Sequence, residues 1–209
     1  MHYMHGMKKL FLLLSLLVAT PAFAADEDHA VAIKQVENYL SSLTTIVADF
    51  NQVSPNGEVA TGKFYLKRPG KMRWQYNPPT PILLVSNGKT VTYFDAELDQ
   101  VNYVPLDDTL AGFLTKEHIQ MNSKATKLVS FTRKDGVSRV TIAQRAKPDE
   151  GKLTLEMSEK PLQLRQMKIV DAGGGETSIQ LQNAQYGMPL KDDLFVFIDP
   201  RGVTPRKRR

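Results

Sequence analysis

Residues 62–95 read GKFYLKRPGKMRWQYNPPTPILLVSNGKTVTYFD and contain the pattern of four β-strands. In the first two, large apolar residues take every second position, which is typical of a strand with one buried face: Phe64 and Leu66, then Met72, Trp74 and Tyr76. Residues 82–85 form an apolar run, and Asn87-Gly88 separates it from a further strand at residues 89–95. Asn-Gly between two such runs predicts a β-hairpin with a type I′ turn. The region therefore predicts consecutive antiparallel strands.

The same alternation predicts strands on both sides of this region, beginning with Ile46, Ala48 and Phe50. Asp135-Gly136 predicts a second hairpin with a type I′ turn. Within residues 162–171 the apolar positions change parity between Leu164 and Met167, which predicts a bulge or a bend. The other predicted strands are residues 101–104, 127–133, 137–143, 152–157, 176–182 and 194–198.

About eleven strands with few helices predict a mainly β fold. Short turns at spacings of about 8–12 residues favour one antiparallel sheet that curls into a barrel or half-barrel, or a sandwich. The length of 209 residues, of which 42% are hydrophobic, suits one globular domain. Parallel α/β arrangements are excluded because helices do not alternate with the strands.

Two segments show helical periodicity. The first begins at a cap, Asp26 or Asp28, and has one apolar stripe: Ile33, Val36, Leu40 and Leu43. The second, residues 107–117, is capped by Asp107 or Asp108 and has on one face Leu110, Phe113 and Leu114. A helix of about three turns that interrupts a series of strands must bury its apolar face, and the concave side of the sheet is the available place. We expect it to act as a plug or a lid.

The N-terminal residues have the pattern of a secretory signal peptide. Lys8 and Lys9 precede a Leu-rich stretch, and Ala22 and Ala24 are the small residues of a cleavage site. We expect cleavage after Ala24, so that residues 1–24 are the leader and residues 25–209 form one exported domain. The Leu-rich stretch is shorter than the roughly 20 residues that a membrane-spanning helix needs. The absence of cysteine excludes disulfides and a lipid-anchoring cysteine.

The charge of the chain does not indicate a nucleic-acid partner. The net charge is +5, and four of the positive charges are consecutive in residues 206–209. Two more lie in the leader, so the body of the domain is close to neutral. We interpret the basic end as a solvated terminus, with contact to anionic lipid as the alternative.

The sequence carries no recognisable catalytic, metal or cofactor motif. His29 and His118 are the only histidines after the leader, and the chain has no Gly-x-Ser-x-Gly, Ser-x-x-Lys or phosphate-binding glycine pattern. Asp95, Glu97 and Asp99 are candidates for a carboxylate cluster, but their place in a turn favours a solvated turn. We therefore expect a protein that is not an enzyme and that holds no metal or cofactor.

Apolar ligand binding is the function class that remains, because small β-barrels hold apolar ligands in their mouths. The alternative is that the large apolar residues simply form the core: Phe50, Phe64, Leu66, Met72, Trp74 and Tyr76. Arg68 stands at a Pro-Gly turn, where its guanidinium can be solvated or can reach carbonyls at the C-terminus of a helix.

Several segments together resemble the LolA family of periplasmic outer-membrane lipoprotein carriers. The most specific are Gly62–Trp74, with its Lys-Arg-Pro turn, and Val85–Thr90, which reads VSNGKT. Ala48–Gln52 and the closing Asp199–Val203 add to the likeness, which spans residues 25–209. The resemblance implies an incomplete antiparallel β-barrel whose apolar cavity is covered by helices and takes up the acyl chains of lipoproteins.

The resemblance also implies roles for individual residues. Arg68 matches the arginine that holds the lid shut by bonding to helix backbone. Leu40 points inward from the first helix, and Met72 falls where docking to an inner-membrane release complex is expected. The acyl-chain cavity and its lid would consist of Leu40, Phe50, Phe64, Leu66, Trp74, Tyr76, Leu110, Phe113 and Leu114.

The implied partners are acylated lipoproteins, an inner-membrane lipoprotein-releasing ABC transporter and an outer-membrane receptor, with the carrier itself a monomer of the periplasm. Two other classes stay open. One is a periplasmic sensor of lipids or lipoproteins on the same half-barrel, although such proteins normally carry a second domain. The other is a hydrolase of envelope components.

Overall fold

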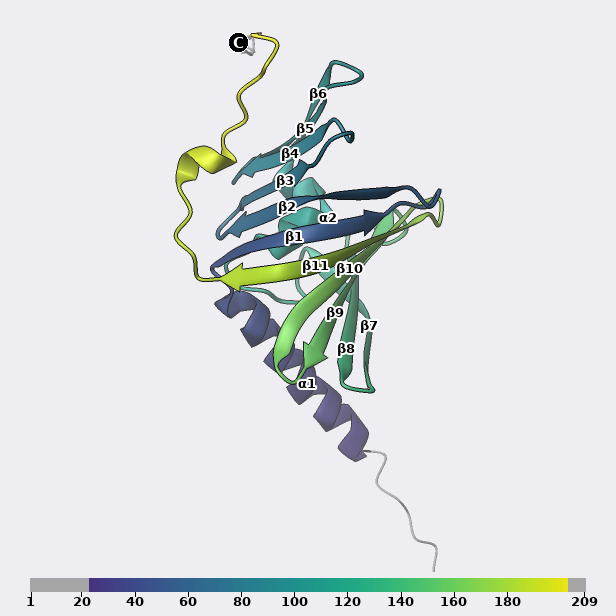
Figure 1. Cartoon of the computed structure of the whole chain (residues 1–209). Coiled ribbons are helices and arrows are strands. Elements are labelled where there is room, and N and C mark those ends of the chain that lie inside the picture. The colour runs from purple at the N-terminus through teal and green to yellow at the C-terminus, as the bar shows by residue number, and fades with distance from the viewer. Residues whose placement is uncertain (1–22, 203–209) are drawn as a thin grey trace, which may run out of the picture.

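The computed structural model describes residues 23–202, which form one open β-sheet, two α-helices and two short 3-10 helices (Figure 1). The strands are β1 (Thr45–Val53), β2 (Val59–Lys67), β3 (Lys71–Tyr76), β4 (Ile82–Asn87), β5 (Thr90–Asp95), β6 (Gln100–Pro105), β7 (Thr126–Lys134), β8 (Val137–Gln144), β9 (Gly151–Glu159), β10 (Leu162–Asp171) and β11 (Glu176–Tyr186). The helices are α1 (Phe23–Ser42), η1 (Leu106–Asp108), α2 (Leu110–Leu114) and η2 (Asp192–Phe195).

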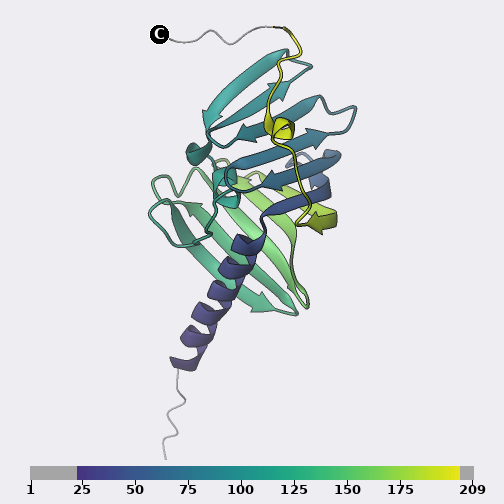
Figure 2. The same ribbon diagram turned by 90° about the vertical axis from the view of Figure 1, so that its left-hand side faces the viewer.

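All eleven strands belong to a single antiparallel sheet in the order β6-β5-β4-β3-β2-β1-β11-β10-β9-β8-β7. The first half, β1 to β6, and the second half, β7 to β11, are each a meander, and they join where β1 pairs with both β2 and β11. The sheet curls around α2, and its two ends, β6 and β7, are edge strands (Figures 1 and 2). The predicted mainly β fold with an incomplete barrel is confirmed, and the sandwich alternative is wrong because there is one sheet.

Helix α1 packs its apolar stripe against the concave side of the sheet. Val36, Leu40 and Leu43 are buried, as the spacing predicts, and belong to the main core. His29 contacts Phe131 of β7 edge to face, with ring centroids 5.7 Å apart. The helix starts at Phe23, so neither Asp26 nor Asp28 is its cap.

The predicted irregularity in β10 is confirmed. The β9–β10 register shifts between Leu164 and Gln166, which moves the buried face from Leu164 to Met167. Without this bulge, Met167 and Leu164 would point to opposite faces of the sheet.

Both predicted hairpins form, but only one has the predicted turn. Asp135 and Gly136 have φ of 54° and 74°, as a type I′ turn requires at its two central residues. In the β4–β5 turn only Gly88 has positive φ, at 102°, so this turn is not type I′. The Asn87 side chain accepts hydrogen bonds from the backbone N–H groups of Lys89 and Thr90 instead of placing Asn87 in the left-handed region.

The second helix is shorter than predicted and has a different cap. Helix α2 has five residues, and the Thr109 side chain accepts a hydrogen bond from Gly112 N at 3.1 Å. Asp107 and Asp108, the predicted caps, lie in the preceding 3-10 turn η1. Pro105 caps η1 and Leu106 begins it, so Asp107 and Asp108 are already inside this 3-10 turn. The cap of α2 is therefore the next residue, Thr109.

The predicted strand at residues 194–198 is wrong. Residues 192–195 form η2, and the segment crosses the outer face of the sheet next to β3 and β4 (Figure 2). β3 and β4 each already have a partner strand on both sides, so neither offers the segment a free edge to pair with. Phe195 is buried, while Val196 and Ile198 are exposed.

The predicted leader lies outside the described residues except for its last two, which begin α1, and the basic end after residue 202 also lies outside them. Among residues 23–202, the structure contains no helix that combines the length and the hydropathy of a membrane span.

Candidate functional site

A cavity of about 250 Å³ lies beneath α2 on the concave side of the sheet. Leu110, Ala111 and Leu114 of α2 form its cover. Its walls come from both halves of the sheet: Gln52, Met72, Trp74, Tyr76, Leu84, Val91, Leu153, Met167, Ile169, Thr177 and Ile179. The lining is almost entirely apolar, so the space suits hydrocarbon. Its volume is below the roughly 300–1,000 Å³ usual for ligand pockets, so a larger ligand must displace the cover.

The structure brings four of the nine predicted cavity residues to this space, Trp74, Tyr76, Leu110 and Leu114. The Tyr76 hydroxyl donates a hydrogen bond of 2.7 Å to Gln52 Oε1, and burial raises the pKa of Tyr76 to about 12. The polar end of this ring is therefore satisfied within the wall, which leaves its apolar face to the cavity.

The other five predicted residues lie elsewhere in the core. Leu40, Phe64 and Leu66 surround a separate space of only about 10 Å³ next to Arg68. Phe50 packs edge to face between Trp74 and Tyr76, with ring centroids 5.1 and 5.0 Å away. Phe113 faces a second cavity on the other side of α2. The position of Phe50 fits the alternative interpretation, in which it is a core residue and not part of a binding cavity.

Met72 does not fit the expected docking role. Its side chain is 1% exposed and lines the cavity beside Trp74, so no surface remains for a partner while α2 covers the cavity. Met72 is paired with Leu66 of β2, so both side chains point to the concave face of the sheet. Met72 is therefore part of the cavity wall.

The cavity residues on β9, β10 and β11 were not predicted. Leu153, Met167, Ile169 and Ile179 are the apolar residues among them. In each strand these residues alternate with residues of the opposite face, and this alternation was the sequence signal that could have identified them. The curl of the sheet, which brings this face opposite Trp74, is not encoded in any single strand pattern.

Arg68 connects the cover to the rest of the fold. It stands at the end of β2, and its Nε donates a hydrogen bond of 3.0 Å to the main-chain oxygen of Leu114 in α2. Its Nη1 donates to the main-chain oxygens of Leu40 and Leu43 at the C-terminus of α1, the latter at 2.8 Å. Burial lowers the pKa of Arg68 to about 10, so the guanidinium stays charged at neutral pH. A cation at these carbonyl ends also complements the helix dipoles.

The turn that carries Arg68 is packed against the β4–β5 turn. Gly70 N donates to the main-chain oxygen of Thr115, just beyond α2, at 2.8 Å. The Ser86 hydroxyl donates to Gly70 O at 2.7 Å. A Cβ on Gly70 would lie 2.6 Å from Gly88 Cα, so this approach requires glycine at position 70. The two most specific sequence segments therefore meet at the end of α2.

Helix α1 holds the loop that follows α2. Glu37 Oε1 accepts a hydrogen bond from Met121 N, and Ser41 Oγ accepts one from Ile119 N, both at 2.9 Å. The Tyr39 hydroxyl accepts a bond of 3.0 Å from Leu164 N at the β10 bulge. Burial raises the pKa of Tyr39 to about 12.

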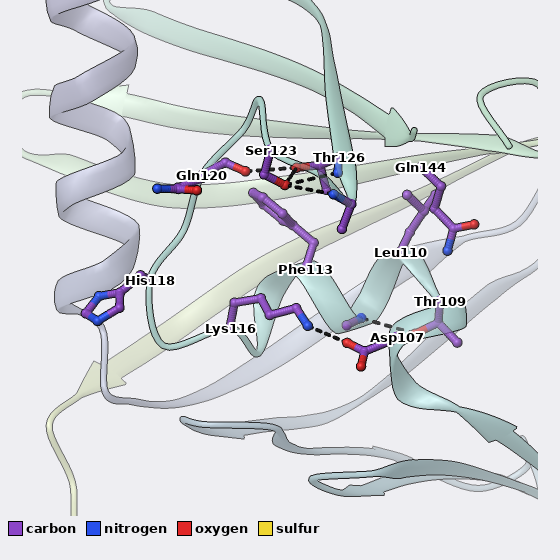
Figure 3. A pocket seen from close by; sticks show the side chains of 12 residues that line it. Asp107, Thr109, Leu110, Phe113, Lys116, His118, Gln120, Ser123, Thr126 and Gln144 are labelled. Atoms are coloured by element: carbon purple, nitrogen blue, oxygen red, sulfur yellow. Dashed lines mark hydrogen bonds and ion pairs between the residues drawn. The ribbon is translucent and has the colours of Figure 1, made fainter. Parts of the chain in front are cut away.

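The second cavity, of about 220 Å³, lies between α2, the loop of residues 116–126 and the end of β8 (Figure 3). Its apolar lining consists of Leu110, Gly112, Phe113 and Ala125. The remaining lining is polar or charged: Asp107, Thr109, Lys116, His118, Gln120, Ser123, Thr126 and Gln144. An ion pair between Lys116 and Asp107 stands at its mouth.

The candidate carboxylate cluster has a structural explanation in the β5–β6 turn. Asp95 Oδ1 accepts hydrogen bonds from the backbone N–H groups of Glu97 and Leu98. Asp99 adopts the left-handed region, and Arg201 donates a bond of 2.9 Å to its main-chain oxygen. The three residues thus shape a turn and fasten the C-terminal segment.

The family model described as "Outer membrane lipoprotein carrier protein LolA" matches residues 41–198. An outer-membrane lipoprotein carrier protein of Chromobacterium violaceum is 30% identical over 205 residues, covering 94% of this chain and 97% of the relative. One of Pseudomonas aeruginosa PAO1 is 29% identical over 204 residues, covering 92% and 97%. The crystal structure of a LolA superfamily protein from Nitrosomonas europaea is 10% identical with a TM-score of 0.45, covering 81% of this chain and 98% of that chain.

Proposed function

Because the chain belongs to the LolA family of outer-membrane lipoprotein carrier proteins, we propose that it carries lipoproteins through the periplasm with their acyl chains held beneath α2. The observation that carries this proposal is the apolar cavity covered by Leu110 and Leu114. A soluble protein must shelter acyl chains from water completely, and a curved sheet with a movable cover provides that shelter.

Arg68 acts as the latch of this cover. Its bond to Leu114 in α2 is made only when α2 lies over the cavity, while its bonds to Leu40 and Leu43 hold it to the end of α1. Cargo that enters must lift α2 and break the bond to Leu114. Re-forming the bond then favours release of the cargo, since the closed carrier is more stable with the latch than without it.

The carrier works between two membrane partners, an ABC transporter of the inner membrane and a lipoprotein receptor of the outer membrane. Moving an acyl chain into water costs about 0.8 kcal/mol per methylene, or roughly 12 kcal/mol for a chain of about sixteen carbons. Spontaneous extraction is therefore negligible, and an energised donor must load the carrier. The carrier binds its cargo as a non-catalytic protein and needs an acceptor that binds the cargo more tightly.

The signal peptide pattern of residues 1–24 supports export, and we propose that residues 25–209 form a single domain that acts as a monomer. The domain description fits the single sheet and shared core of the described residues.

Depletion of the protein in its own cell tests the proposal. Lipoproteins destined for the outer membrane should accumulate in the inner membrane when the two membranes are separated, and the wild-type chain should restore their distribution. Purified protein loaded in the periplasm should contain lipoprotein in about equal molar amount. Unchanged distribution of lipoproteins after depletion would falsify the carrier function, and a stable complex with a signalling protein would support the sensor class instead.

A further inference from the structure

We propose that the second cavity binds the polar junction of the cargo, namely the ester and amide carbonyls through which acyl chains are attached to a lipoprotein. This rests on the proposed function, because it divides one amphiphilic ligand between two neighbouring cavities. The hydrocarbon lies in the first cavity, and the carbonyl groups lie in the second.

The two cavities are neighbours that share a wall. Thr109 and Leu110 line both of them, on either side of α2. The Leu110 side chain also approaches the start of β9, since a Cβ on Gly151 would lie 3.6 Å from Leu110 Cδ1. Movement of α2 therefore withdraws Leu110 from between the cavities and joins them into one space.

The second cavity has a larger share of polar residues than the first, although the surface of both is mainly apolar. Three of the fifteen residues around the first cavity, Gln52, Thr109 and Thr177, are neither apolar nor aromatic. Around the second cavity eight of twelve are polar or charged, while Leu110 and Phe113 continue the apolar floor. This difference matches a ligand whose hydrocarbon ends in carbonyl groups, because buried carbonyls require hydrogen-bond donors.

Gln144 is the donor best placed for such a carbonyl. It shares the inward face of β8 with Val140 and Ile142, which are both 0% exposed, and is itself half-buried. Figure 3 shows its amide above Leu110 and Thr109, with no dashed line to another side chain drawn there.

The neighbouring hydroxyl groups already have partners. Ser123 Oγ lies 2.8 Å from Thr126 Oγ1, and Thr126 Oγ1 donates to the main-chain oxygen of Gln120 at 2.9 Å. These bonds occupy the two hydroxyls within the loop, and the Thr109 hydroxyl donates to the main-chain oxygen of Leu106 at 2.8 Å. The other side-chain donors of the lining, Lys116, His118 and Gln120, are exposed, so Gln144 is the half-buried donor that remains for a ligand.

Two synthetic lipopeptides test the inference. They have the same peptide and the same chain length, but one carries ester-linked chains and the other carries ether-linked chains, which lack the carbonyl. The wild-type protein should bind the ester form about threefold to tenfold more tightly, the range expected for one hydrogen bond. The Gln144→Leu variant should bind both forms with the affinity that the wild type shows for the ether. Gln182→Leu, an exposed glutamine of β11, is the matched control and should keep the preference.

A blocking variant tests occupation of the cavity independently. Ala125 is an exposed residue of the lining, so Ala125→Trp fills the mouth without burying a new side chain in the core. It should weaken binding of both lipopeptides at least tenfold, whereas Lys124→Trp, at the exposed neighbouring position outside the lining, should bind as the wild type does.

The outcomes separate this inference from the carrier function. If the wild type binds both lipopeptides equally, if Gln144→Leu keeps the ester preference, or if Ala125→Trp binds normally, the second cavity does not hold the junction. If the wild type binds neither lipopeptide, the acyl-chain function itself is wrong.

Discussion

Arg68 and Leu114 are joined by a hydrogen bond of 3.0 Å, although 46 positions separate them in the chain. The same guanidinium donates to Leu40 in the last turn of α1 and to Leu43, just beyond the helix. One side chain thus connects the β2–β3 turn, α1 and the cover of the cavity. Helix α2 cannot move away from the sheet without losing the Leu114 bond.

Replacing this arginine should shift the balance between loading and release. Arg68→Leu removes charge-assisted bonds worth about 1.5–3 kcal/mol each, so the closed form becomes less stable relative to the open form. We expect lipopeptide affinity to rise about tenfold or more and transfer to receptor-containing membranes to slow in proportion. Arg73→Leu is the control, because Arg73 bonds to Gln75 and to the main-chain oxygen of Leu194. Transfer by Arg68→Leu at the wild-type rate would disprove the latch.

The close approach of the two turns should make Gly70 unusually sensitive. Gly70→Ala places a Cβ 2.6 Å from Gly88 Cα at a residue with φ of 77°. The left-handed conformation costs about 1–2 kcal/mol for a non-glycine residue, and the clash adds about 1–3 kcal/mol. Gly136→Ala has a similar φ of 74° but open space, so it should lose only the conformational part. Urea unfolding measures both free energies, and equal losses would show that the contact is unimportant.

Two buried tyrosines should make the fold sensitive to alkaline pH. The pKa of Tyr39 and that of Tyr76 are each raised from 10.0 to about 12 by burial. The folded state therefore retains these protons more tightly than the unfolded state does. The corresponding stability is fully present below pH 10 and is lost as the pH rises from 10 to 12. Urea unfolding across this window should show a steeper loss in the wild type than in the double variant Tyr39→Phe, Tyr76→Phe; identical slopes would contradict the assignment.

Asp192 should fasten the C-terminal segment to the sheet. Its Oδ1 lies 2.6 Å from Lys67 Nζ and 2.9 Å from Lys71 Nζ, and these lysines lower its pKa to about 2. The contribution is present above the ordinary pKa of 3.8 and is lost as the pH falls towards 2. Asp192→Asn should increase proteolysis within residues 188–198 at neutral pH, while Asp193→Asn, whose carboxylate is not the partner of these lysines, should not. Equal cleavage of the two variants would show that the ion pairs do not hold the segment.

Local pattern predicts most of the fold because each strand faces the core with one parity. The parity change between Leu164 and Met167 reveals the bulge, and Asn87-Gly88 and Asp135-Gly136 locate both hairpins. Residues 194–198 mislead because their apolar run, LFVFI, resembles a buried strand, whereas pairing depends on a free edge that the sequence does not display.

The site is predicted less completely, for a similar reason. The apolar face of α2 and the position of Arg68 follow from local spacing and turn chemistry. Which apolar residues line a hollow and which fill the core depends on how far the sheet curls. Phe50 and Trp74 have the same strand pattern, yet only Trp74 borders the cavity.

The edges β6 and β7 give the sheet a property that a closed barrel lacks. In a closed barrel the number of strands and their stagger set the girth, so expansion must break hydrogen bonds between strands. In this sheet β6 and β7 are not paired with each other, so no ladder closes it. Separation of β6 from β7 would therefore break no hydrogen bonds of the sheet, so strand pairing does not fix the width of the interior.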